Sequence, residues 1–179
     1  MTRWLMTWMT LATIPAGAIA QEAHSPYAHA GSGEIKTLSQ QEVDDLRNGA
    51  GMGLARPAEL NQYPGPRHVL ELADSLALSA EQRQAVEATF ADMQGRAKTL
   101  GMQILEAEKA LDAAFAAGGM TEEALAHAVS EIARLQGELR TVHLRAHLAT
   151  RDALTRHQIH EYDRLRGYRS GHTHPGNPS

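Results

Sequence analysis

The sequence contains no cysteine, which excludes several kinds of chemistry at once. Thiolate zinc sites, iron–sulfur clusters, cysteine nucleophiles and disulfide-stabilised folds all need that residue. Aromatic residues make up only 4% of the 179 residues, so we expect a modest core of aliphatic side chains. The formal net charge of −4 gives no global basic surface for nucleic acid. The length suits one domain with a tail and excludes a large multidomain enzyme.

Residues 1–20 are typical of a cleavable bacterial secretory signal. Arg3 supplies a short positive segment, residues 4–14 are apolar, and an Ala-Ile-Ala sequence ends at Ala20. The apolar run is shorter than the roughly 20 residues that span a bilayer, so cleavage after Ala20 is favoured over a membrane anchor. The sequence therefore predicts a periplasmic protein without a transmembrane span after cleavage.

Composition divides the remaining chain into four segments. Residues 21–38 are polar with Pro, Gly and Ser, which predicts a flexible leader. Residues 39–65 begin with a capping box and short helix and continue as a Gly/Pro-rich loop. A helical domain is expected over 66–168, with its first helix over 66–76. The histidine-containing tail, 169–179, has a composition typical of disorder.

Two long heptad patterns dominate the helical domain. Apolar residues recur at alternating spacings of three and four over 86–114 and again over 125–153. Gly118 and Gly119 separate the two patterns. The sequence therefore predicts an all-α fold, a long antiparallel helical hairpin with short flanking helices. One hairpin leaves apolar flanks bare, so we expect partner helices or a second copy of the chain to cover them.

Two similar capping boxes bracket this predicted hairpin. Each has an apolar residue before a hydroxyl N-cap and a glutamine three residues after the cap. The first box is formed by Leu78, Ser79 and Gln82, and the second by Leu154, Thr155 and Gln158. We interpret all six residues as structural caps. Any two helices can begin in this way, but a pair of boxes around a long hairpin is a more specific pattern.

The paired boxes resemble the motif of the LTxxQ family of bacterial envelope proteins, the Spy/CpxP type. The resemblance covers about residues 66–168, and Ser79 stands where the family motif has threonine, which keeps the hydroxyl cap. It implies an all-α and commonly dimeric protein. Members act as ATP-independent chaperones, as inhibitors of envelope-stress sensor kinases, or as proteins that respond to zinc, nickel, cobalt or copper. The boxes are structural in that family, so they indicate a fold without naming a ligand.

Histidines are the candidate metal ligands. His143 and His147 are four residues apart, so their imidazoles share one helical face and can chelate a divalent ion. A symmetric hairpin register brings Glu87 near them, and water or another chain would complete the site. The alternative is that both histidines are ordinary polar residues at the edge of the seam. The HExxH glutamate is missing between them, so a zinc protease is disfavoured.

Other histidines form weaker candidate pairs. His157 and His160 lie three residues apart near the end of the helical domain, and His172 and His174 lie in the tail. Both pairs are candidates for capturing metal, with solvated histidines as the alternative. No cofactor is indicated beyond Zn, Cu, Ni or Co. No nucleophile elbow, P-loop or dinucleotide fingerprint is present, so we expect no enzymatic activity.

A candidate partner surface lies in the same part of the chain. Leu144 and Leu148 point roughly opposite the seam, which predicts a second apolar contact. Packing under the 66–76 helix or the 51–63 loop, dimerisation and client binding are the alternatives. Three arginines near these leucines would supply charge to a partner: Arg140, Arg145 and Arg151.

The sequence therefore favours a periplasmic envelope-stress protein of the Spy/CpxP type, which binds unfolded or stress-related proteins without ATP. The expected partners are unfolded envelope proteins, a sensor kinase and a second copy of the chain in a homodimer. The alternative function is a periplasmic heavy-metal sensor or buffer that uses histidines.

Overall fold

The computed structural model describes residues 35–168, and this part of the chain contains helices and turns but no strand. Its helices are α1 (Gln40–Asn48), α2 (Arg56–Glu59), α3 (Pro66–Glu71), α4 (Ala80–Ala117), α5 (Glu122–Ala153) and α6 (Arg156–Leu165). The all-α prediction is confirmed for this part. The predicted signal, 1–20, and the predicted tail, 169–179, lie outside the described residues. Over 35–168, no helix combines the length and the apolar character needed to cross a bilayer.

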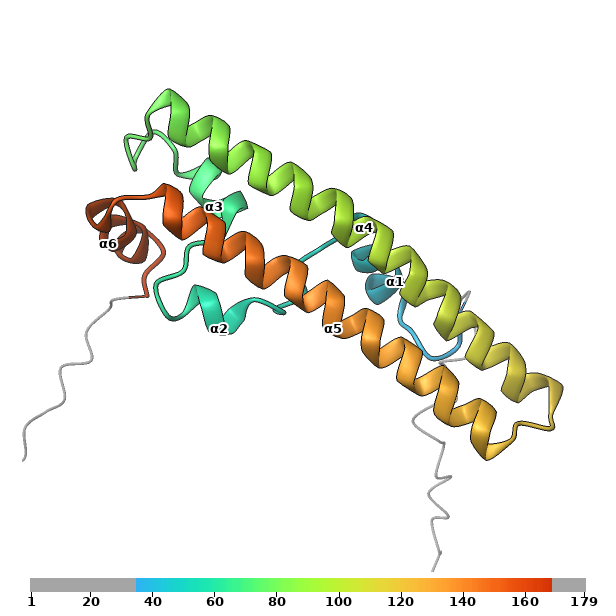
Figure 1. Ribbon diagram of the computed structural model, residues 1–179. Coiled ribbons are helices and arrows are strands. Elements are labelled where there is room, and N and C mark those ends of the chain that lie inside the picture. Colours follow the sequence, from blue (N-terminus) through green and yellow to red (C-terminus); the bar gives the residue numbers. More distant parts are fainter. Residues whose placement is uncertain (1–34, 169–179) are drawn as a thin grey trace, which may run out of the picture.

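The two long helices, α4 and α5, pack side by side (Figure 1). The connection between them is residues 118–121, in which Gly118 and Gly119 both adopt positive φ angles. Thr121 then caps α5 by accepting a hydrogen bond from the backbone N–H of Ala124. The buried side chains follow the predicted heptad patterns: Val86, Met93, Ala97, Ile104, Ile132, Leu135, Leu139, Val142 and Ala146.

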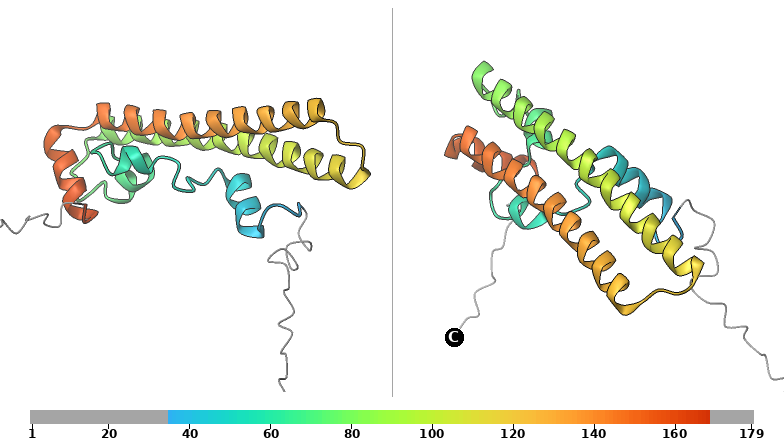
Figure 2. Two further views of the ribbon diagram at one scale, coloured as in Figure 1. Left: turned by 90° about the horizontal axis from the view of Figure 1, so that it is seen from below. Right: turned by 45° about the vertical axis from the view of Figure 1, so that its right-hand side comes forward.

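The short helices cover one face of the α4–α5 pair (Figure 2, left). Both α1 and α3 contact α4, while α2 and α3 contact α5. The crossing of α1 over α4 is very close, because a Cβ atom on Gly101 would lie 2.0 Å from the carbonyl oxygen of Leu46. Only glycine allows the backbones to approach in this way.

Three segments differ from the sequence-based expectation. Residues 35–38, expected as the end of a flexible leader, pack on the core instead, and Ile35 is only 2% exposed. The helix expected over 66–76 ends at Glu71, since the chain turns over the following residues and Ala77 has a positive φ. The expected Gly/Pro loop contains the short helix α2, which begins next to a proline that favours a first helical turn.

The two predicted capping boxes are present. Ser79 and Thr155 are the N-caps of α4 and α6, and each box is closed by the glutamine three residues later. The preceding leucines, Leu78 and Leu154, pack in a cluster formed by α3, the start of α4 and α6. The boxes therefore fix both the starts of the helices and the apolar contact beside them.

The two boxes also bind each other. The side-chain amides of Gln82 and Gln158 each donate a hydrogen bond to the other's oxygen at 2.9 Å. Gln82 donates in addition to the carbonyl of Ala153, and Gln158 to the carbonyl of Leu76. This amide pair joins the first turn of α4 to the first turn of α6, at the end of the molecule opposite the Gly118–Gly119 turn.

A prediction follows from the contact between α1 and α4. We expect Gly101→Ala to lower the free energy of unfolding by about 1–3 kcal/mol, because the added methyl group overlaps the Leu46 carbonyl and α1 must move. Gly95→Ala on the same helix is the control, since a Cβ there meets nothing within 4 Å. It should raise stability by about 0.5–1 kcal/mol through helix propensity. Urea unfolding measures both, and equal effects would contradict the close crossing.

Candidate functional site

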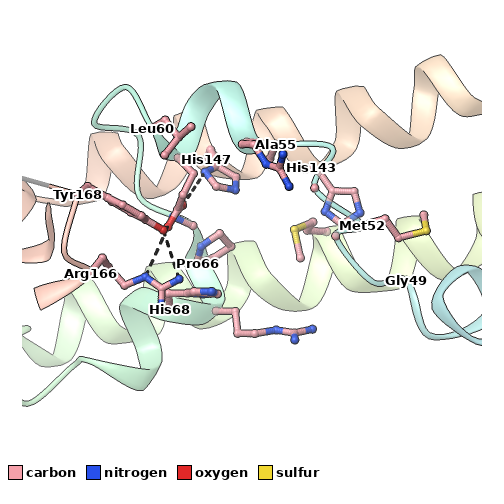
Figure 3. Close-up of a pocket in the computed structure, with 17 residues that line it drawn as sticks. Gly49, Met52, Ala55, Leu60, Pro66, His68, His143, His147, Arg166 and Tyr168 are labelled. Carbon is pink, nitrogen blue, oxygen red and sulfur yellow. Dashed lines mark hydrogen bonds and ion pairs between the residues drawn. The ribbon is translucent and has the colours of Figure 1, made fainter. Parts of the chain in front are cut away.

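A pocket of about 530 Å³ lies where residues 49–68 cross the α4–α5 pair (Figure 3). The loop before α2, α2 itself and the start of α3 form one side. Met93 of α4 and two histidines of α5 form another side, and Arg166 and Tyr168 close the end. The volume falls in the range of small-molecule sites, about 300–1,000 Å³. Since the pocket also contains both of the histidines predicted as ligands, we take it as the candidate ligand site.

Glu59 of α2 holds this side of the pocket together. Its Oε1 accepts hydrogen bonds from the hydroxyls of Tyr162 and Tyr168, and its Oε2 accepts the backbone N–H of Gly65 at 3.1 Å. The guanidinium Nε of Arg166 lies 3.8 Å from Oε1. Burial, together with the hydrogen bond to Glu59, raises the pKa of Tyr162 above its ordinary value, so that hydroxyl remains a donor.

His147 of α5 is fixed by the same segment. Its Nδ1 lies 2.7 Å from the carbonyl oxygen of Tyr63 and 3.6 Å from Oε2 of Glu59. A carbonyl oxygen only accepts, so Nδ1 carries the proton in this contact. Gly65 covers the ring, and a Cβ atom there would lie 3.0 Å from its Cε1. The imidazole is therefore held in one orientation by residues of the 49–68 segment.

His143 lies one turn earlier on α5 and differs from His147 in its hydrogen bonding. The side chain lines the pocket and is only 4% exposed, and its Nε2 is the one buried side-chain polar atom without a hydrogen-bond partner in residues 35–168. Burial lowers the pKa of His143, and the nearby His147 and Arg67 lower it further. The ring is therefore neutral at neutral pH and retains an unused hydrogen-bonding nitrogen.

The charges around the pocket are predominantly positive. Arg56, Arg67 and Arg166 all line it, whereas Glu59 is the one carboxylate among its lining residues. Arg56 and Arg67 form no ion pair with any carboxylate of the described chain. Burial and the charge of Arg166 lower the pKa of His68, which also lines the pocket. The site therefore combines two arginines that have no carboxylate partner with two histidines, His68 and His143, whose pKa values are lowered.

The predicted metal set is only partly brought together. His143 and His147 share the pocket, but Glu87 is exposed on α4 and no hydrogen bond or ion pair of the described residues joins it to either ring. The carboxylate beside His147 is instead Glu59, which the sequence reasoning missed. Within residues 35–168, no group of three or more His, Asp or Glu side chains is arranged to hold a metal ion.

The remaining candidate histidines lie elsewhere. His157 and His160 are exposed on α6, while His172 and His174 lie outside the described residues. Metal binding by any of these side chains therefore stays a prediction.

The two leucines of the predicted partner surface, Leu144 and Leu148, differ from each other in burial. His143 and His147 are the α5 side chains covered by the 49–68 segment, whereas Leu148 is 51% exposed and Leu144 is half-buried. The predicted packing of Leu148 under the 51–63 loop is thus wrong. A role for Leu148 in client binding or dimerisation stays a prediction.

The three predicted arginines differ in their surroundings. Arg140 and Arg145 are exposed on α5, and Arg145 lines a groove between α4 and α5. Arg151 is also exposed, but its guanidinium lies 4.4 Å from the centre of the Tyr63 ring. This cation–π contact fastens the 49–68 segment to α5, so Arg151 has a structural contact that the other two lack.

Comparison with known proteins gives no match to a family model, a curated protein or a solved structure. The LTxxQ resemblance therefore depends on the two capping boxes alone. Any function for the chain has to be argued from its own side chains.

The buried state of His143 predicts a pH dependence of stability. Its pKa in the folded protein lies below its pKa in the unfolded chain, so the unfolded chain takes up more protons as the pH falls through about 6.5. The free energy of unfolding should therefore decrease between about pH 7.5 and 5.5, and His143→Gln should reduce this decrease. Urea unfolding at the two pH values measures it. The exposed His127 provides the control, and a His143→Gln protein with the same pH dependence as His127→Gln would contradict the assignment.

Proposed function

We propose that the protein binds other proteins through the α4–α5 pair, as an ATP-independent, chaperone-like protein of the bacterial envelope. The observation that carries this proposal is the end of the pair, next to the Gly118–Gly119 turn, where no side chain is buried. From residue 106 to residue 131 no side chain is buried, although both long helices continue through this range. We name this end of the pair, residues 106–131, the distal arm.

The distal arm carries large apolar side chains that are exposed in the described chain. Phe115 is 56% exposed and Val129 is 50% exposed. Leu125 is exposed and Leu111 half-buried, although both belong to the heptad patterns. A helix pair buries its apolar residues when a partner is present, and large exposed apolar side chains on both helices of the pair are the surface that such a partner would cover. The arm therefore supports binding of a protein partner.

Charged and apolar side chains also alternate closer to the pocket. Arg145 lines the groove between α4 and α5 together with Asp92 and Arg96, and Leu148 is exposed one turn from Arg145. Such a mixed surface favours many weak contacts with an unfolded chain over a single tight one. Unfolded envelope proteins fit it best, and a sensor kinase or a second copy of the chain is the other partner class.

The finer features of the proposal come from the sequence. The signal-like sequence of residues 1–20 supports a periplasmic location, and the two capping boxes support a Spy/CpxP-type hairpin for the α4–α5 pair. A homodimer would cover part of the distal arm by pairing like surfaces.

A heavy-metal sensor or buffer for zinc, copper, nickel or cobalt is the second candidate. One observation favours it: His143 and His147 are adjacent in the pocket, and Nε2 of His143 has no partner. The charge of the surrounding arginines opposes a cation, so protein binding is the better supported function.

The test is suppression of client aggregation. At stoichiometric amounts the purified chain should reduce light scattering from a chemically unfolded client protein. The double variant Phe115→Ser/Val129→Ser should weaken client binding about fivefold. The two substitutions remove apolar area whose burial against a client contributes about 1 kcal/mol to the binding free energy. Leu60→Ser, which removes an equally exposed apolar side chain from outside the arm, is the control and should act as the wild type. If the wild-type chain leaves aggregation unchanged, the proposal is wrong.

A further inference from the structure

Two arginines beside His143 have no carboxylate partner in the described chain, although the guanidinium of Arg67 lies 5.8 Å from the centre of the Phe90 ring. Arg56 and Arg67 line the pocket without an ion pair, and the carboxylate of Glu59 is already engaged by two tyrosine hydroxyls and a backbone N–H. Guanidinium groups form their strongest hydrogen bonds with carboxylates and phosphates. The charge of the pocket therefore fits an anion.

Part of the pocket wall is apolar. Met52, Leu60 and Met93 line it, and Met52 and Leu60 are exposed although both are large apolar residues. Exposed apolar side chains beside a pocket supply surface that a ligand can cover. The wall therefore suits a molecule that has an apolar body as well as a charge.

Two local features show that the pocket is specialised. The buried Nε2 of His143 lacks a partner, and a buried polar atom without one costs free energy that a ligand could recover. The backbone of Met52 has a φ of 44°, which is uncommon for a residue with a side chain and is typical of strained segments at binding sites. Figure 3 shows both labelled residues beside the same pocket.

We propose that this pocket binds a small organic carboxylate with an apolar chain. The arginines attract the carboxylate, and the neutral His143 ring provides a hydrogen-bonding nitrogen beside them. The apolar chain lies against the methionine and leucine side chains of the wall. The volume of about 530 Å³ accommodates a molecule of this kind. The site is separate from the distal arm and does not depend on the protein-binding function.

A divalent metal is the competing ligand, and the structure favours the anion. A metal needs three or more ligands in suitable geometry, and residues 35–168 contain no such group of His, Asp or Glu. The nearby guanidinium groups repel a cation and attract an anion. The unpartnered Nε2 of His143 is therefore better placed to bind a carboxylate beside the arginines than to complete a metal site.

The experiment is a calorimetric titration of the full chain with octanoate, and with octanol as the uncharged probe of equal chain length. Octanoate should bind saturably, at least about tenfold more tightly than octanol, because the charge-assisted hydrogen bonds are lost with the alcohol. The double variant Arg56→Gln/Arg67→Gln should weaken octanoate binding about tenfold or more. Arg96→Gln is the control, since this exposed arginine pairs with Asp92 outside the pocket, and it should bind octanoate as the wild type does.

The arginines are exposed, so their variants should fold, and equal thermal midpoints check this. His143→Ala is the second variant and should also weaken octanoate binding. Equal affinities for octanoate and octanol, or unchanged affinity in Arg56→Gln/Arg67→Gln, would overturn the proposal. The proposal would also be wrong if octanoate gave no heat and Zn²⁺, Cu²⁺, Ni²⁺ or Co²⁺ bound instead. If that metal bound to the wild type and not to His143→Ala, the pocket would be assigned to a metal.

Discussion

The pocket end of the molecule depends on the hydrogen bonds that the carboxylate of Glu59 accepts. It joins α2 to the start of α3 through the N–H of Gly65, and to α6 and the following turn through Tyr162 and Tyr168. His147 brings α5 into the same group. Because Tyr162 is fully buried, its hydroxyl has no access to water and needs this acceptor. One side chain thus satisfies donors from segments that lie far apart in the sequence.

The two ends of the α4–α5 pair consequently differ. At the pocket end, the amide pair of Gln82 and Gln158 holds α6 against the start of α4. Glu59 holds the 49–68 segment in place, so hydrogen bonds of buried and half-buried side chains position the helices there. At the other end the distal arm buries no side chain. The pocket at one end and the exposed apolar side chains at the other are the basis of the two kinds of binding that we propose, one of a small ligand and one of a protein.

The long helices could be predicted from the sequence because their determinants are local. Heptad spacing, two adjacent glycines and hydroxyl caps all act within a few residues, and α4 and α5 begin and end close to the expected positions. The candidate site could be predicted only in part, since the i, i+4 spacing puts His143 and His147 on one face but does not say what covers them. That cover comes from Glu59, whose partner Tyr162 is 103 residues away.

Other differences have the same origin. Leu148 was a candidate for packing under the loop, yet the loop covers the histidines, because the carbonyl of Tyr63 needs a donor and His147 supplies one. Ile35 belongs to a polar stretch and still packs in the core, since α1 folds back onto α4 at Gly101. Neither contact leaves a periodic signal in the sequence. The density of glycine and proline over 49–66 was the one visible sign of an unusual segment.

The most direct test of the role of Glu59 is hydrogen exchange of Glu59→Gln compared with the wild-type chain. A glutamine amide accepts through its oxygen and only donates through its nitrogen, whereas Tyr162, Tyr168 and the Gly65 N–H all donate to Glu59, so at least one of these donors loses its acceptor in either orientation. Exchange should become faster over 49–68 and in α6 and stay unchanged in the centre of α4 and α5. Unchanged exchange over 49–68 would contradict the claim that Glu59 holds this segment in place.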